Sequence, residues 1–318
     1  MDDFTSTVLF YTLALIITFG VIGNVLSFII FHYGKRCSAI ASSAYFKCLA
    51  VADCFVLLVP CTELLLFLQP ANIDMRPYSA FVCKLYVYSA FFWTTVSTWI
   101  TVAITTDRTL TLCFPLKFRM STTSRRIYLK VLCILAILIP LTSFHAIVVK
   151  YNDGDCNFVF DNKFSEFFQQ TFIAIFIFLI PFVINGTCNV LISCLLWKRT
   201  RVNSLKGQNV TRRRGTAQNF TYRVLAITIF HMVSVLPIGV MKIMDILKSP
   251  VSVTVFTIAN VLFYLNSGVN FVLYCVSGRD FRRDVKAMLR ICCCKPELER
   301  GNTWNTSTRL STIEGVRQ

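Results

Sequence analysis

Several polar side chains within long apolar stretches could together bind a small hard cation. Asp53 lies in the middle of the apolar run 43–68. A charge at such a position is energetically costly, which makes it a candidate for function. Other apolar runs offer amide and hydroxyl groups to its carboxylate: Asn24, Ser97, Asn266 and Asn270. Oxygen ligands suit an ion such as sodium. The alternative is a hydrogen-bonded structural acid, and spacing alone leaves both interpretations open.

A second pair, Asp107-Arg108, closes the apolar run 80–113. A neighbouring carboxylate can hold a guanidinium and keep it from other partners. Release of that arginine would expose a docking site, as in a two-state switch. The alternative is an ordinary salt bridge at the end of a membrane helix.

Acidic residues near the other end of the bundle, opposite to Asp107-Arg108, could receive a cationic ligand. Glu63 lies ten residues after Asp53, and Asp153 and Asp155 belong to the segment that follows the fourth run. Carboxylates of this kind can pair with an arginine or an amine. A rim acid without a ligand is the alternative for Glu63. The three histidines are scattered and no metal-binding cluster stands out, so we expect no enzyme.

The elements that must position these residues are seven apolar runs, each long enough to cross a bilayer. The chain has 318 residues, of which 55% are hydrophobic and 15% charged. Soluble proteins are about 25% charged. We therefore expect an all-α membrane protein, a seven-transmembrane helix bundle, with spans near 8–32, 43–68, 80–113, 126–149, 166–197, 221–246 and 251–277.

The distribution of basic residues predicts the orientation of the bundle. With the N-terminus outside, 26 of the 32 Lys and Arg residues fall on the inner side, as the positive-inside rule requires. The net charge of +16 then faces anionic lipid and indicates no nucleic acid partner. We expect a multi-pass protein of the plasma membrane whose residues 1–7 form an extracellular N-terminus.

The cysteines fit this orientation. Of fourteen, only Cys83 and Cys156 fall at outer loops or helix ends, which predicts a disulfide between them. We expect the seven-transmembrane domain to span 8–277 and residues 278–294 to form a short amphipathic eighth helix in the membrane interface. Its cysteine cluster is a candidate for palmitoylation, and 295–318 forms a polar cytoplasmic tail. The cluster consists of Cys292, Cys293 and Cys294.

Together these landmarks resemble the rhodopsin-like (class A) G-protein-coupled receptors over nearly the whole chain. The segment 263–283 further resembles invertebrate neuropeptide receptors of the FMRFamide-receptor-like group. The matching motifs are Gly23-Asn24-Val25, the LAVAD ending at Asp53, Cys83 with Cys156, Asp107-Arg108, Pro181, Pro237, and Asn270 to Tyr274.

The resemblance implies roles for these residues and partners for the chain. Arg108, beside Asp107, would contact a heterotrimeric G protein, while Asn270, Tyr274 and Pro237 would belong to the activation switch. Asp53, Ser97, Asn266 and Asn270 would form an allosteric sodium pocket; no other cofactor is implied. Arrestin and a receptor kinase are candidate partners besides membrane lipid. The expected ligand is a short basic neuropeptide, and a lipid or a small chemosensory molecule is the alternative ligand. A membrane transporter is the alternative class of protein and fits the motifs less well.

Some positions depart from the family pattern. Ala217, shortly before the sixth run, stands where the family usually has an acid opposite Arg108, which predicts a weak inactive-state contact. Val235 replaces the usual tryptophan, and Phe271 replaces the usual proline. Ala90 stands where amine receptors carry an aspartate, and Tyr264 stands where opsins carry a lysine. Both of those ligand classes are therefore disfavoured.

Overall fold

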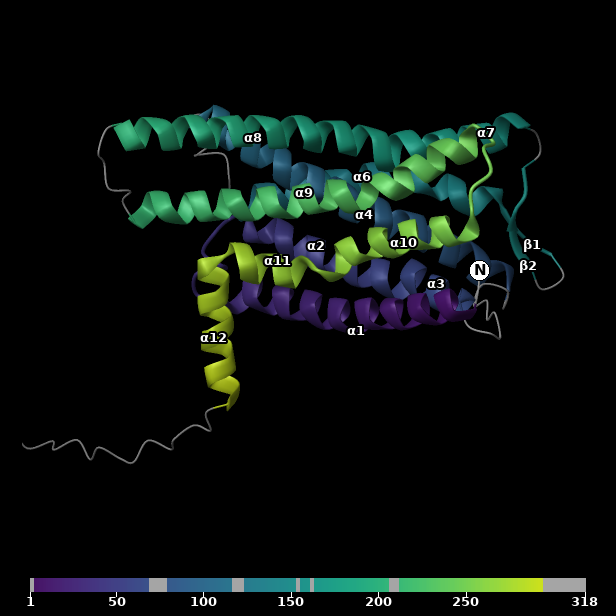
Figure 1. The fold of residues 1–318 in the computed structure, drawn as a ribbon, viewed down its shortest axis with the longest axis horizontal. Helices are drawn as coiled ribbons and strands as arrows, with labels where there is room; N and C mark the ends of the chain where they lie inside the picture. Colours follow the sequence, from purple (N-terminus) through teal and green to yellow (C-terminus); the bar gives the residue numbers. More distant parts are fainter. Residues whose placement is uncertain are drawn as a thin grey trace, which may run out of the picture.

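The protein is described here by a computed structural model that covers residues 3–68, 79–115, 123–152, 155–160, 163–205 and 212–293. Its helices lie side by side in one elongated bundle, with a β-hairpin at one end and α12 at the other (Figure 1). We call these the hairpin end and the α12 end. The helical elements are α1 (Asp3–Tyr33), α2 (Ser43–Val56), η1 (Leu57–Cys61), α3 (Thr62–Phe67), α4 (Ala80–Cys113), α6 (Ser124–Val148), α7 (Lys163–Phe172), η3 (Ile173–Leu179), α8 (Ile180–Leu205), α9 (Arg212–Ile246), α10 (Val253–Gly268), α11 (Asn270–Ser277) and α12 (Arg279–Cys293).

Seven spans account for these helices, which confirms the predicted number. Six are long and apolar enough by themselves to cross a membrane: Asp3–Tyr33, Ser43–Phe67, Ala80–Cys113, Ser124–Val148, Lys163–Lys198 and Thr221–Ile246. The seventh consists of α10 and α11, which are bent by 53° at their junction. The first span begins five residues earlier than the apolar run 8–32 indicated.

Proline disturbs the second span locally without breaking it. Pro60 lies inside η1, a five-residue π-helical segment. Proline has no backbone N–H, so the helix cannot keep its usual hydrogen-bond ladder there. The Tyr86 hydroxyl donates to the Val59 carbonyl (2.5 Å) and the Thr62 hydroxyl donates to the Leu57 carbonyl (3.0 Å). These two side chains thus add hydrogen bonds within the turn that the proline disturbs.

The bend in the seventh span occurs without a proline. It falls at Val269, between Gly268 and Asn270. Gly268 faces Gly20 of α1, and a Cβ added to Gly20 would lie 2.8 Å from the Gly268 Cα. Small residues allow two membrane helices to approach this closely.

We expect Gly20→Ala to destabilise the bundle by about 1 to 3 kcal/mol, because overpacking forces backbone shifts. The new Cβ would lie 2.6 Å from Leu57 Cδ1 as well as against the Gly268 backbone. Gly239→Ala is the matched control, since its Cβ would meet only Phe178, at 3.6 Å or more. Thermal unfolding of the purified variants in detergent compares them. Equal midpoints would show that the α1–α10 contact tolerates a methyl group.

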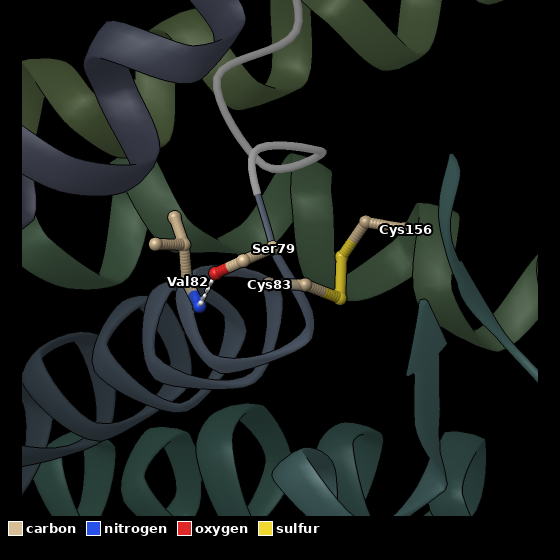
Figure 2. Close-up of a disulfide and its surroundings, with 4 residues drawn as sticks. All are labelled: Ser79, Val82, Cys83 and Cys156. Atoms are coloured by element: carbon tan, nitrogen blue, oxygen red, sulfur yellow. Dashed lines mark hydrogen bonds between the residues drawn. A yellow bond between two sulfur atoms is a disulfide. The ribbon is translucent and has the colours of Figure 1, made fainter. Parts of the chain in front are cut away.

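At the hairpin end, β1 (Val149–Asn152) pairs antiparallel with β2 (Asp155–Phe158). The sequence pattern does not predict this hairpin. Cys156 in β2 forms a disulfide with Cys83 in the first turn of α4, which confirms the predicted bridge. Figure 2 shows the bridge beside the start of α4, where the Ser79 hydroxyl caps the helix by accepting from the Val82 N–H (3.2 Å). The bridge closes a loop of 73 residues and fixes the hairpin over the bundle.

At the opposite end, α12 runs across the bundle rather than along it (Figure 1). Its apolar face is anchored by Phe281, which is fully buried. The Phe281 ring packs against Phe31 of α1 (5.3 Å between centroids) and Tyr274 of α11 (5.4 Å). The bounds of α12 lie within the predicted segment 278–294.

Candidate functional site

Asp53 is the centre of a polar cluster within the bundle. Its side chain is fully buried. One carboxylate oxygen accepts from the Ser97 hydroxyl of α4 and the other from the Asn270 amide of α11, both at 2.6 Å. The Ser267 side chain, on α10, also lies close to this carboxylate. The cluster therefore joins three of the seven spans at a single buried acid.

The other two predicted cluster members point elsewhere. The Asn24 amide donates to the Ser267 carbonyl (2.9 Å) and so ties α1 to the break in the seventh span. The Asn266 amide nitrogen lies 3.2 Å from His231 Nδ1 on α9. Ser267, which sequence reasoning missed, occupies the place expected of Asn266, because adjacent helical residues point in different directions.

The cluster contains oxygen atoms of several kinds. Asn270 Oδ1 is buried and has no hydrogen-bond partner within the described ranges. It belongs to the side chain whose amide nitrogen donates to the Asp53 carboxylate. No cluster of three His, Cys, Asp or Glu residues suited to a metal occurs in the part of the chain that the structure describes. An ion here would depend on hydroxyl and amide ligands.

Arg108 connects α4 to α9 at the α12 end. Its Nε donates to the Thr221 hydroxyl (2.7 Å), and a second guanidinium nitrogen bonds the same oxygen. The contact comes from Thr221, one helical turn after Ala217, the position where an acid is usual. A neutral hydroxyl therefore links the two helices that an ion pair usually links in the family.

Asp107 is engaged by two residues that sequence reasoning did not name. Its carboxylate accepts from the Tyr45 hydroxyl of α2 (2.6 Å) and from Lys130 Nζ of α6 (2.6 Å and 2.8 Å). Tyr45 is buried, whereas Lys130 is half exposed. Asp107 therefore joins α2, α4 and α6, while Arg108 reaches α9.

The two remaining residues of the expected switch, Tyr274 and Pro237, lie in α11 and α9. Tyr274 is buried, with its ring 5.1 Å from Phe31 and 5.3 Å from Phe46 between centroids. Pro237 lies inside α9, two residues after the buried Val235. On the same helix, the Thr228 hydroxyl donates to Asn189 Oδ1 of α8 (2.6 Å).

A cavity of about 260 Å³ opens near the hairpin end. Glu63 lines it, as the sequence suggested, and Lys242 of α9 lines it as well. The other polar groups come from Thr94, Asn260 and Tyr264. The remaining lining is mainly aromatic and aliphatic, contributed by α4, η3, α9, α10 and β2: Val87, Ala90, Phe91, Phe158, Ile173, Ile177, Phe178, Ile238, Phe256 and Phe263, with Pro60 of η1.

Some predicted site residues lie outside the described part. Asp153 and Cys294 fall in undescribed segments. The side chains of Asp155, Cys292 and Cys293 are likewise not described, although their backbones belong to β2 and α12. Their proposed roles in ligand binding and palmitoylation stay predictions.

A polar junction that the sequence did not reveal holds α12 to the segment after α1. Asp284 of α12 is buried and accepts from the backbone N–H groups of Arg36 (3.0 Å) and Cys37 (2.9 Å). Its other oxygen pairs with the Arg36 guanidinium (3.3 Å). Burial raises the pKa of the Cys37 thiol to about 12, so this thiol is protonated at neutral pH. In the sequence, Asp284 is simply an acid on the polar side of an amphipathic helix, and this pattern does not predict its contact with the segment after α1.

Seven spans, a bridge from the third span to the hairpin, a buried acid in the second and an Asp-Arg pair at the end of the third define the class of seven-helix membrane receptors. The family model of the 7 transmembrane receptor (rhodopsin family) matches residues 23–274. The chain belongs to this family, the rhodopsin-like G-protein-coupled receptors. The family consists of receptors, which confirms the expectation that the chain is not an enzyme.

Curated relatives support the same assignment. The FMRFamide receptor of Drosophila melanogaster is 25% identical over 287 residues, which cover 83% of this chain and 50% of that receptor. The chain thus spans half the length of that relative. Type-1 angiotensin II receptors of Bos taurus and Homo sapiens are 25% and 24% identical over 322 aligned positions, covering 94% of this chain and 84% of each receptor.

Proposed function

We propose that this chain is a plasma-membrane receptor that binds a short basic peptide at an extracellular hairpin end and activates a heterotrimeric G protein at a cytoplasmic α12 end. One observation supports this most directly. A single bundle contains a partly polar cavity at one end and Arg108, bonded to Thr221, at the other. The Asp53 cluster lies within the same bundle and ties α4 to α10 and α11.

The proposed ligand class is supported by charge and by similarity. Glu63 supplies a carboxylate to a cavity that is otherwise largely apolar, which suits a ligand with a basic group and aromatic side chains. The names of the two kinds of relative refer to peptides, FMRFamide and angiotensin II. A lipid or a small chemosensory molecule is the second candidate, because an apolar lining also suits such ligands.

The expected role of sodium is a stabilising one. Asp53, Ser97, Ser267 and the unused oxygen of Asn270 are the residues that would hold the ion. A bound cation would offset the negative charge of the buried carboxylate and hold α2, α4 and α11 together. Without the ion, the two hydrogen bonds to Asp53 perform part of this task.

The coupling claim is tested in cells that express the chain with G-protein reporters. We expect aromatic-basic peptides to evoke a response that Arg108→Ala abolishes, because Arg108 would contact the G protein. Surface expression is measured in parallel, and lipid and small-molecule libraries are applied to the same cells. A surface-expressed chain that is silent with every ligand, or whose response survives Arg108→Ala unchanged, would contradict the proposed coupling.

Glu63→Gln should lower the potency of an active basic peptide by about tenfold or more. The substitution keeps the shape of the side chain and removes the charge that pairs with the ligand, and such desolvated pairs contribute about 1.5 kcal/mol or more. Glu166→Gln is the control, because Glu166 of α7 does not line the cavity. Unchanged potency in Glu63→Gln would exclude Glu63 as the basic-group acceptor.

A further inference from the structure

The ligand cavity contains two charges of opposite sign. Glu63 and Lys242 are its only charged residues among the lining residues that the structure describes. They come from different spans, α3 and α9, and both are partly buried. Lys242 lies near the end of the sixth apolar run, and α9 continues to Ile246 and carries this lysine into the cavity wall. A cavity for a purely cationic ligand would not be expected to expose a lysine.

The surroundings of Lys242 leave its ammonium group suited to an incoming anion. Its Nζ lies 5.3 Å from the centroid of the Phe256 ring, which also lines the cavity. Within the described ranges Lys242 forms no salt bridge, and Asp245 interacts with it only at longer range. Burying a charge without a partner is unfavourable, so an anionic group delivered by a ligand would be strongly stabilised there.

We propose that Lys242 is the anchor for a carboxylate of the ligand, so that the cavity receives a zwitterionic peptide end and not an amidated one. This inference rests on the proposed function and specifies its ligand class. The basic group of the peptide pairs with Glu63, its carboxylate pairs with Lys242, and an aromatic side chain packs against rings such as Phe91, Phe256 and Phe263. A volume of about 260 Å³ suits one end of a peptide more than a whole one.

The geometry favours the C-terminal carboxylate over an acidic side chain. A C-terminal carboxylate lies at the end of the peptide, so it can enter the cavity without the chain continuing on both sides of it. An amide at the same position has no charge to neutralise Lys242. The amidated and the free-acid forms of one peptide therefore differ only in the terminal group that would pair with Lys242.

The test is binding of paired peptides to the purified receptor, read from the shift of its thermal unfolding midpoint. The probes are di- to hexapeptides of Phe, Met and Arg, including Phe-Met-Arg-Phe, each as a free acid and as an amide. A third set carries an amidated end and an internal Glu, which separates a side-chain carboxylate from a C-terminal one. The receptor variants are Lys242→Gln, Lys242→Arg and, as the matched control, Lys163→Gln at an exposed position of α7.

We expect at least one free acid to bind about tenfold or more tightly than its amide. Lys242→Gln should remove that preference by weakening only the acid, Lys242→Arg should retain it, and Lys163→Gln should behave like wild type. Preference for the amide, an equal loss of both forms in Lys242→Gln, tightest binding of the internal-Glu set, or binding of no free acid would each overturn the proposal.

This outcome is separable from that of the proposed function, because unfolding midpoints require no G protein. An amide that binds and activates a G protein would refute the carboxylate anchor and leave the receptor function in place. A free acid that binds through Lys242 without any G-protein response would support the carboxylate anchor and contradict the proposed G-protein coupling.

Discussion

Replacing Thr221 with valine should raise ligand-independent signalling about tenfold. Valine keeps the shape of threonine but removes the hydroxyl that accepts from the Arg108 guanidinium. A hydrogen bond to a charged group contributes about 1.5 to 3 kcal/mol, and 1.4 kcal/mol corresponds to a factor of ten in a conformational equilibrium. The described arrangement holds α4 and α9 together at the α12 end. Loss of this bond therefore favours any state in which the two helices separate.

The measurement is basal G-protein signal per receptor at the cell surface, without ligand. Thr187→Val is the control, because Thr187 is an exposed threonine of α8 whose hydroxyl bonds its own helix at Val183. Arg108→Ala combined with Thr221→Val should be silent, since the arginine itself would contact the G protein. Wild-type basal signal in Thr221→Val, at equal surface expression, would show that the bond does not favour the inactive state.

The sequence was sufficient to predict the parts of the fold that depend on the bilayer. A span must be about 20 apolar residues long, and this requirement alone located all seven runs. The same apolar pattern identified Asp53 as a candidate site residue, because a carboxylate inside a span is costly. It also placed Cys83 and Cys156, unlike the other cysteines, at outer loops or helix ends. The β-hairpin was missed because its two strands have only four residues each.

The site was harder to predict wherever helix rotation decides which neighbouring residue faces inward. Ser267 and Asn266 are adjacent, yet Ser267 reaches Asp53 while Asn266 reaches His231. Packing between helices sets this rotation, and the sequence of one helix does not encode it. The contact between Arg108 and Thr221 could not be predicted for a related reason. Thr221 lies one turn after Ala217, the position where the family usually carries an acid, and an isolated threonine carries no local signal.

The surroundings of charges near the ends of helices could not be predicted from sequence either. Lys242 lies near the end of an apolar run and Asp284 lies among basic residues of an amphipathic helix, and neither pattern predicts what the side chain contacts. In both cases the environment comes from elements distant in sequence: Phe256 and the cavity for Lys242, and the segment after α1 for Asp284. A one-dimensional pattern locates such charges along the helix and leaves their surroundings undetermined.

Asp284→Ala should detach α12 from the bundle and lower the stability of the receptor by about 2 to 4 kcal/mol. The substitution leaves the N–H groups of Arg36 and Cys37 without their acceptor, and each unsatisfied buried donor costs about 1 to 3 kcal/mol. The Arg36 side chain is half exposed and can recover its hydration, so its salt bridge adds little to the loss. Asp280→Ala is the matched control on the same helix. Its pairing with the exposed Arg283 is long, at 3.9 Å.

Thermal unfolding reports the global loss, and Cys37 reports the local one. In the intact junction, burial keeps the thiol inaccessible and its pKa near 12, which leaves about a thousandfold less reactive thiolate than at the ordinary value. Asp284 itself contributes to raising that pKa, so its removal both exposes the thiol and favours the thiolate. We therefore expect maleimide modification of Cys37, resolved by mass spectrometry of its peptide, to become fast in Asp284→Ala and to stay slow in Asp280→Ala. Fast modification of Cys37 in the wild-type receptor would show that the junction does not protect this thiol. Slow modification in Asp284→Ala together with an unchanged midpoint would mean that Phe281 and its aromatic neighbours hold α12 in place without Asp284.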